Sequence, residues 1–169
     1  MVTEGYRIRR TEADDWREVR ELRLEMLQDT PIAFAEFHHD ALTHSESEWR
    51  MRAARGTAEH GIALAAIDAA GRWVGTMGGY VPDPATGPLL VGVYVAPDHR
   101  GRDAGVFDTL LAAIEDWAHG EGEVLTLHVH EDNARARAAY LRRGFTETGH
   151  RVPYVLDAGA QEIEMVKRL

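Results

Sequence analysis

Residues 91–117 read VGVYVAPDHRGRDAGVFDTLLAAIEDW, and this segment decides the fold. It continues an apolar run, Leu89–Val95, which predicts a central strand buried on both faces. Pro97 ends the pairing of that strand, and an amphipathic helix is expected at about 105–120. Glycines let the intervening loop turn tightly, and the helix N-terminus offers unpaired N–H groups with a partial positive charge. The segment therefore predicts a phosphate or diphosphate site, with a plain strand-to-helix turn as the alternative.

A second informative segment, residues 125–145, reads LTLHVHEDNARARAAYLRRGF. Its start predicts a strand over Val124–His130, and its middle predicts a helix at 134–143. Asn133 stands between the strand and the helix, and Tyr140 follows two helical turns later. Residues at this spacing point to the same side of a helix, so Asn133 and Tyr140 are expected to face one site.

The flanking sequence predicts the rest of one domain that spans residues 1–169. Thr11 is the expected cap of a first helix, Ser45 and Glu48 form a capping box for a second, and Ala-Ala-Gly joins two strand-like runs as a hairpin. The expected elements are a strand at 5–10, helices at 13–29 and 45–55 around an irregular stretch at 32–43, hairpin strands at 61–68 and 72–81, and two final strands within 145–169. The order β-α-α-β-β-β-α-β-α-β-β indicates an α/β or α+β sheet with helices on both sides.

The composition narrows the class of function. The 169 residues are 44 % hydrophobic and 28 % charged, as in soluble globular domains, and the lack of cysteine excludes thiol catalysis. No apolar run approaches the roughly 18 residues of a membrane span, and no signal peptide is recognised, so we expect a cytoplasmic protein without a membrane partner. The formal net charge of −9 disfavours nucleic acid and favours a cationic acceptor through long-range attraction. The histidines at 38, 39 and 44 lack a placed carboxylate pair, so no metal is expected.

Both segments resemble the GNAT superfamily of N-acetyltransferases. The family loop is Gln/Arg-x-x-Gly-x-Gly/Ala, and this chain reads Arg100-x-x-Asp103-x-Gly105, with a carboxylate where the middle glycine usually stands. Asn133, Tyr140 and the Gly144-Phe145 pair repeat the second half of the family pattern. The likeness extends over nearly the whole chain.

The resemblance implies a GNAT-like mixed, mostly antiparallel sheet of about seven strands, splayed between the fourth and fifth, with about four flanking helices. It implies acetyl-coenzyme A as co-substrate, with Asn133 on the pantetheine arm and Tyr140 near the sulfur. The backbones of the strand and loop would hold the rest of the coenzyme. The residues assigned to it are Val93, Tyr94, Val95, Arg100, Gly101, Arg102, Asp103, Ala104, Gly105 and Val106.

Direct attack in a ternary complex requires a neutral amine, a stabilised oxyanion and a protonated or otherwise stabilised thiolate. Tyr140 is the candidate acid, with core packing as its alternative role. His128 is the candidate base, and Glu36, as base or amine-binding anion, and bulk water are the alternatives. Phe34, Glu36, His128 and His130 are the expected acceptor-binding residues.

The resulting hypothesis is an N-acetyltransferase that acts on the primary amine of a small molecule, peptide or protein. The alternative is a non-catalytic acyl-coenzyme A sensor on the same scaffold. A homodimer is compatible with the resemblance, although the sequence carries no marker for it.

Overall fold

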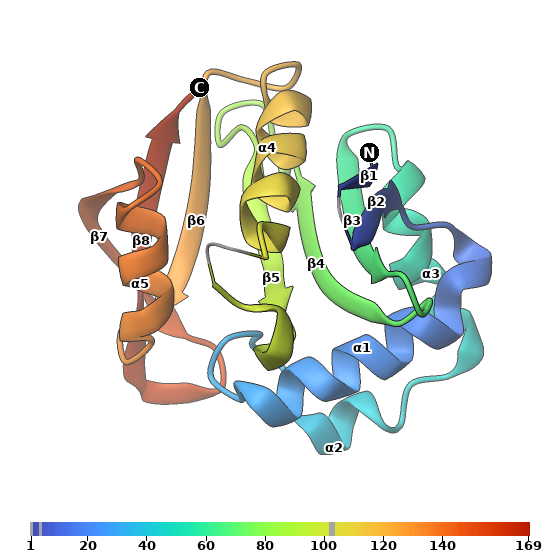
Figure 1. Cartoon of the computed structure of the whole chain (residues 1–169). Helices are drawn as coiled ribbons and strands as arrows, with labels where there is room; N and C mark the ends of the chain where they lie inside the picture. The colour runs from blue at the N-terminus through green and yellow to red at the C-terminus, as the bar shows by residue number, and fades with distance from the viewer. Residues whose placement is uncertain (1, 4, 102–103) are drawn as a thin grey trace.

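The computed structural model describes the chain except for residues 1, 4, 102 and 103 (Figure 1). The described residues form one eight-stranded sheet in the order β1-β2-β3-β4-β5-β6-β8-β7. Neighbouring strands are antiparallel except β5 and β6, which run parallel. The strands are β1 (Val2–Thr3), β2 (Tyr6–Arg10), β3 (Gly61–Asp68), β4 (Trp73–Tyr80), β5 (Leu89–Val95), β6 (Val124–His130), β7 (Thr146–Tyr154) and β8 (Asp157–Arg168). The predicted mixed, mostly antiparallel sheet is confirmed, and β1 is an addition that the sequence did not predict.

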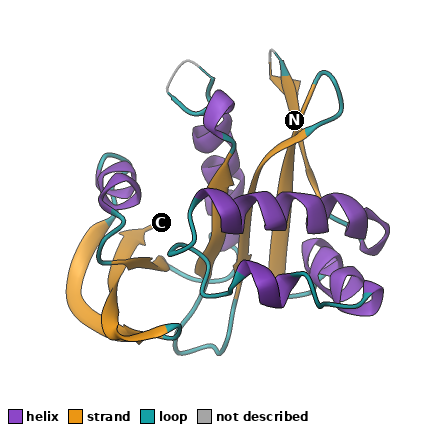
Figure 2. Ribbon diagram, turned by 90° about the horizontal axis from the view of Figure 1, so that it is seen from below, coloured by secondary structure: helices purple, strands orange, loops and turns teal. Residues whose placement is uncertain are grey.

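Helices cover both faces of this sheet, as predicted. A Cβ added at Gly75 on β4 would lie 3.3 Å from Leu110 of α4, whereas the neighbouring Thr76 lines a cavity on the opposite face. Seen from below, α1 crosses in front of the central strands (Figure 2). The helices are α1 (Trp16–Asp29), α2 (His38–Ala41), α3 (Glu46–Ala53), α4 (Val106–Ala118) and α5 (Ala134–Leu141), with 3-10 turns at Ala13–Asp15, Ala54–Thr57 and Pro97–His99.

The sheet splays between β5 and β6, which are the fourth and fifth strands of the sequence prediction. Leu89 opposite Thr126 is the one register pair between them within the described residues, and the Thr126 N–H donates to the Pro88 carbonyl at 3.1 Å. Beyond that point the two strands diverge (Figure 1). The register of β5 against β4 shifts beside Gly92, whose φ of 59° is left-handed, so a bulge bends β5 where the splay opens. The predicted splay is confirmed.

The prediction that β5 is buried on both faces is wrong. Val91 is 39 % exposed, and Leu89, Gly92 and Val93 are only partly buried. The cause is the departure of β6, because a strand without a neighbour on one side presents part of its surface to a cavity. An apolar run therefore marked a strand at the centre of the sheet but not the environment on its two sides.

The first helix also begins differently from the prediction. The cap lies one residue later, where the Glu12 N–H donates to the Asp15 carboxylate at 2.8 Å. The buried Thr11 hydroxyl instead donates to the Ala53 carbonyl at 2.7 Å. This bond ties the end of α3 to the end of β2 and fixes one wall of the larger cavity.

The main core lies between the sheet and α4. Leu110 and Ile114 of α4 are fully buried and belong to one hydrophobic cluster with the buried strand residues Val74 and Met77. A smaller cluster under α1 holds Trp49. None of the described helices is both long and apolar enough to cross a membrane.

Candidate functional site

Two cavities adjoin at the splay. The small cavity, about 240 Å³, lies between the end of β5, the start of α4 and α5. The large cavity, about 830 Å³, lies on the side of the sheet that carries α1 and α3. Leu89–Gly92 line the large cavity and Val93–Val95 line the small one, so β5 passes from one to the other. Ala33 and Phe34 line both, which places Phe34 at their junction.

The backbone of β5 is exposed to the small cavity. The Ala96 N–H donates to the Val74 carbonyl at 2.8 Å, which turns Ala96 towards β4. Because successive peptide groups alternate along a strand, those of Val93 and Val95 point the other way, into the splay. Amide groups in this position can pair with an extended ligand as a neighbouring strand would.

The Arg100 side chain is engaged in contacts within the protein. Its Nε donates to the Val95 carbonyl at 2.7 Å, its other nitrogen pairs with the Asp29 carboxylate, and its guanidinium lies 5.6 Å from the Tyr94 ring centroid. Arg100 borders the small cavity, as predicted for a ligand-binding residue, but its contacts fasten the loop to the end of α1. Its charge reaches a ligand through space and not through a free guanidinium.

The N-terminus of α4 forms the other end of the small cavity. Gly105 is the N-cap, with a left-handed φ of 67° and no side-chain cap. Among the described residues no side chain caps the first-turn N–H groups of this thirteen-residue helix, and such groups can hold an anion. Gly101, at a φ of 111°, borders the cavity, whereas Ala104 and Val106 pack against the core. The predicted ligand residues Arg102 and Asp103 lie outside the described residues.

Cations from α5 and from the residues directly after it surround the same cavity. Arg143 pairs with Asp108 at 2.5 Å and lies 4.3 Å from the Phe107 ring centroid. Arg135 and Arg142 also line the cavity, are exposed, and have no ion pair among the residues that the structure describes. They make the surroundings of the α4 N-terminus positive although the chain as a whole carries a formal charge of −9. These two arginines were not predicted from the sequence. Their spacing of two helical turns, which places both on one side of a helix, could have indicated them.

Asn133 and Tyr140 both line the small cavity, on the one side that their spacing predicted. The Asn133 Oδ1 accepts from the Ala136 N–H at 3.2 Å as the cap of α5, which leaves its amide N–H groups for a ligand. The Tyr140 ring packs on Phe107 and Phe145, with centroids 6.1 and 5.6 Å away. Burial raises the pKa of Tyr140, so its hydroxyl stays protonated at neutral pH and can act as a donor.

His128 lines the large cavity, on the opposite side of the junction from Tyr140. Its Nε2 lies 3.4 Å from a carboxylate oxygen of Glu164 on the neighbouring strand β8. A carboxylate in this place orients the imidazole ring.

His130, the second histidine of β6, is buried and lines neither cavity. Its Nδ1 accepts from the Asp132 N–H at 3.1 Å, and its ring packs edge-on against Tyr154. These contacts are structural, so the geometry argues against the expected role of His130 in acceptor binding.

Glu36 is held by three side chains. It accepts from Arg52 at 2.7 and 3.0 Å, from Arg23 at 2.9 Å, and contacts the His44 Nε2 at 2.7 Å. Although burial opposes the charge, these partners lower the pKa of Glu36 to about 2. A carboxylate with this pKa does not take up a proton near neutral pH, and its contacts leave little room for an amine. The geometry argues against Glu36 as base or anion site and leaves His128 or water.

The histidines at 38, 39 and 44 do not form a metal site with their neighbours. Within the described part of the chain, no group of three or more histidine, cysteine or carboxylate side chains could hold a metal ion. His39 stacks on Phe37 with centroids 5.2 Å apart, and His44 bridges towards Glu36.

Comparison with known proteins gives a consistent assignment. The sequence profile of the Acetyltransferase (GNAT) family matches residues 16–145. Among solved structures, the chain is similar to a GCN5-related N-acetyltransferase from Kribbella flavida, with 22 % identity and a TM-score of 0.75 over 98 % of this chain and 99 % of that one. It is also similar to the PaiA N-acetyltransferase from Thermoplasma acidophilum in complex with coenzyme A, with 19 % identity, a TM-score of 0.75 and the same two coverages of 98 % and 99 %. A ribosomal-protein-alanine N-acetyltransferase from Brucella melitensis shows 22 % identity and a TM-score of 0.75 over 96 % and 99 %. A search of curated proteins finds no match.

Proposed function

Because the chain belongs to the Acetyltransferase (GNAT) family, we propose that it transfers an acetyl group from acetyl-coenzyme A to a primary amine of a small molecule or peptide, by direct attack in a ternary complex. The observation that carries the proposal is the meeting of two ligand surfaces in the small cavity. The N-terminus of α4, which no described side chain caps, suits a diphosphate, and the Val93 peptide groups together with the Val95 N–H suit an extended amide-bearing arm. Acetyl-coenzyme A supplies both, together with the thioester that an amine attacks.

In this proposal, different groups of residues bind different parts of the coenzyme. The first-turn amides of α4 hold the diphosphate, while Arg135 and Arg142 add long-range attraction. The β5 backbone and the Asn133 amide hold the arm from two sides. Gly105 fits this use because a Cβ there would meet the Tyr6 hydroxyl at 3.3 Å and because its left-handed φ disfavours other residues.

The chemical roles follow the two cavities. The Tyr140 hydroxyl, held protonated by burial, donates to the departing sulfur from the small cavity. The amine enters from the large cavity and reaches the thioester at the junction beside Phe34. His128, directed by Glu164, takes the proton of the amine either directly or through water.

Coenzyme binding is tested first by melting. Saturating coenzyme A is expected to raise the melting temperature, because a ligand that binds only the native state stabilises it. Gly105→Ala should weaken that effect, whereas Gly71→Ala should leave it unchanged. Gly71 is a matched control, since it has a left-handed φ of 86° and lies in the β3–β4 turn. If coenzyme A leaves the melting temperature of the native chain unchanged, the proposal fails.

Catalysis is tested by thiol release from acetyl-coenzyme A with a panel of amines. Tyr140→Phe should lower kcat by about ten- to a thousandfold and change KM little. Tyr154→Phe is the control, a buried tyrosine that lines neither cavity. Coenzyme binding without thiol release from any amine would instead support the acyl-coenzyme A sensor.

Several expectations stay predictions. They are a single transferase domain over residues 1–169, a cytoplasmic location and a homodimer. Asp103 also belongs here, and Asp103→Gly is expected to bind coenzyme A more tightly by calorimetry, because the substitution removes a carboxylate beside the diphosphate.

A further inference from the structure

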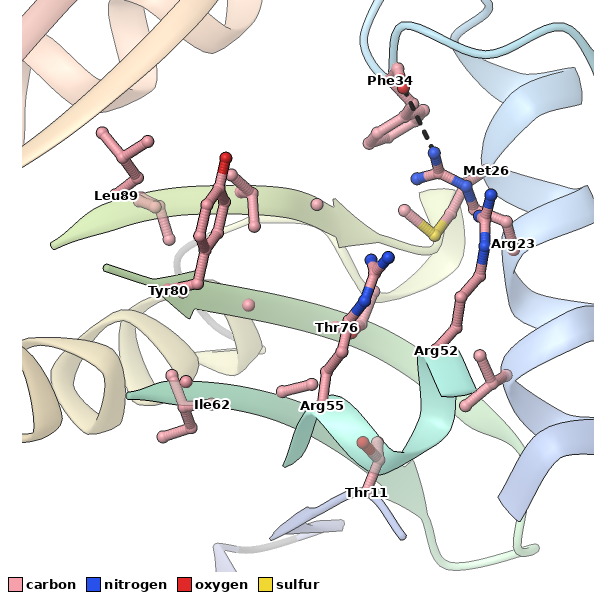
Figure 3. Close-up of a pocket in the computed structure, with 18 of the residues that line it drawn as sticks. Thr11, Arg23, Met26, Phe34, Arg52, Arg55, Ile62, Thr76, Tyr80 and Leu89 are labelled. Carbon is pink, nitrogen blue, oxygen red and sulfur yellow. Dashed lines mark hydrogen bonds between the residues drawn. The ribbon is translucent and has the colours of Figure 1, made fainter. Parts of the chain in front are cut away.

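The large cavity has one strongly basic wall, made of Arg23, Arg52 and Arg55. Arg23 comes from α1, Arg52 from α3, and Arg55 from the helical turn Ala54–Thr57 that follows α3. All three line the cavity. Figure 3 shows the Arg55 side chain extending into the middle of the cavity, between Tyr80 and Arg52.

Two of these guanidinium groups are paired within the wall and one is not. Arg23 and Arg52 share the Glu36 carboxylate, with shortest contacts of 2.8 and 2.7 Å. Arg55 has no hydrogen bond or ion pair from its side chain to any residue that the structure describes. Three cations therefore face one half-buried carboxylate, and the guanidinium without a partner is the one that points into the cavity.

This arrangement of charges costs free energy. Burial and the neighbouring charge of Arg52 lower the pKa of Arg55, with the Glu36 carboxylate opposing them only in part. A partly desolvated cation without a counter-ion costs free energy, which an anion placed against it recovers. A planar guanidinium is also the side chain best suited to grip a carboxylate or phosphorus oxyanion through two hydrogen bonds.

Another part of the same cavity carries the opposite character. Glu162 on β8 and His128 on β6 both line it, and Glu162 is half-buried without a hydrogen bond or ion pair to the described residues. A carboxylate and an imidazole in this place suit the arriving amine as an ammonium ion and then accept its proton. The walls contributed by Leu22, Met26 and Ile62 are apolar.

We propose that the acceptor is a small amphipathic molecule that carries an oxyanion in addition to its amine, and that Arg55 binds the oxyanion. This inference rests on the proposed acetyl transfer and names the substrate class. The cavity of about 830 Å³ has room for an apolar body between the two charged groups. The chemical class is an amino acid with a large apolar side chain, or its phosphonate counterpart. Polyamines are disfavoured, since added positive charge would meet the basic wall.

The local charge of the cavity wall is opposite in sign to the net charge of the chain. An overall charge of −9 favours cations far from the surface, but screening limits that field to about 8–10 Å at ordinary ionic strength. Within the cavity the nearest charges decide, and on this wall they are positive.

A binding experiment tests the anion site without any catalysis. Phenylacetate and phenylphosphonate, which lack an amine, are titrated into the full chain, and the melting temperature is followed. At least one is expected to raise it in the native chain and not in Arg55→Met. Arg168→Met is the matched control, because Arg168 is an exposed arginine on β8 away from both cavities. If neither anion stabilises the native chain, or if Arg55→Met responds like the native chain, the proposal is overturned whatever the transfer assay gives.

A transfer experiment tests the substrate class. Thiol release is compared for phenylalanine, its phosphonate analogue and phenethylamine, which differ only in the anionic group. At least one anionic acceptor should exceed phenethylamine in kcat/KM, and Arg55→Met should remove about tenfold or more of that advantage while sparing phenethylamine. The carboxylate and phosphonate arms tell the two oxyanions apart. Equal losses for acceptors with and without the oxyanion would overturn the role of Arg55. Failure of every amine while coenzyme A and the anions still bind would overturn the transfer and retain the anion site.

Discussion

Replacing Glu36 by glutamine should destabilise the protein strongly, because Glu36 holds together the loop before α2, the helix α1 and the helix α3. Its pKa falls from an ordinary 4.5 to about 2 through its bonds with Arg52, His44 and Arg23. A difference of about 2.5 units corresponds to about 3 kcal/mol, at about 1.4 kcal/mol per unit. Removing one partner of a buried ion pair typically costs about 3–5 kcal/mol, which agrees.

The pH dependence gives the sign of the effect. The folded-state pKa lies below the unfolded one, so the stabilisation is fully present above about pH 4.5 and is lost as the pH falls towards about 2. Urea unfolding of the native chain and Glu36→Gln should therefore differ by about 3 kcal/mol at pH 7, and the difference should shrink through that window. Glu59→Gln is the control, since Glu59 is exposed and has no ion pair to the described residues.

Two results would refute this reasoning. One is a loss below about 1 kcal/mol at pH 7, the value typical of a surface pair. The other is a loss that does not change between pH 7 and pH 3. The same variant bears on catalysis, because the folded fraction of Glu36→Gln should keep the native pH–rate profile if Glu36 is not the base.

Three further predictions concern other parts of the structure. Phe145→Ala should cost about 3–5 kcal/mol in urea unfolding, because Phe145 is 1 % exposed and supports the Tyr140 ring. Gly56→Ala should cost about 3 kcal/mol by the same measurement, since a Cβ there would lie 2.1 Å from the Thr11 carbonyl oxygen and the backbone would have to move. His128→Ala should remove the acid limb of the pH–rate profile of kcat/KM while coenzyme A binding stays intact; an unchanged profile would leave bulk water as the base.

The element order and the coenzyme side of the site were readable from the sequence. Periodicity and glycine placement depend on neighbours within a few residues, so the strand Val124–His130 was predicted with its observed bounds. The spacing of Asn133 and Tyr140 likewise placed both on one cavity. Local pattern was sufficient because strand, turn and helix each obey short-range geometry.

The acceptor side was much less readable because it depends on long-range contacts. Glu36 looked like a free carboxylate in a loop, and only the fold brings Arg23 and Arg52 onto it. His130 looked equivalent to His128, yet the turn after β6 buries it. Nothing in the sequence indicated that Arg55 binds a ligand, since one arginine near the end of a helix is common. The two arginines that bind Glu36 lie 13 and 16 positions from it in the sequence, beyond the reach of a local pattern.

Within the described residues, the pairing of Leu89 with Thr126 is the one register pair that joins two parts of the sheet, while the core packed against α4 spans both parts. One part consists of β6, β7 and β8 with α5, and the other consists of β1 to β5 with α1 and α4. A molecule that binds along the β5 backbone would act as a removable ninth strand and would hold the two parts of the sheet together. Slow opening motions of the free protein should therefore be largest between β5 and β6. Amide hydrogen exchange at Val93 and Val95 should slow more than elsewhere when a molecule binds there.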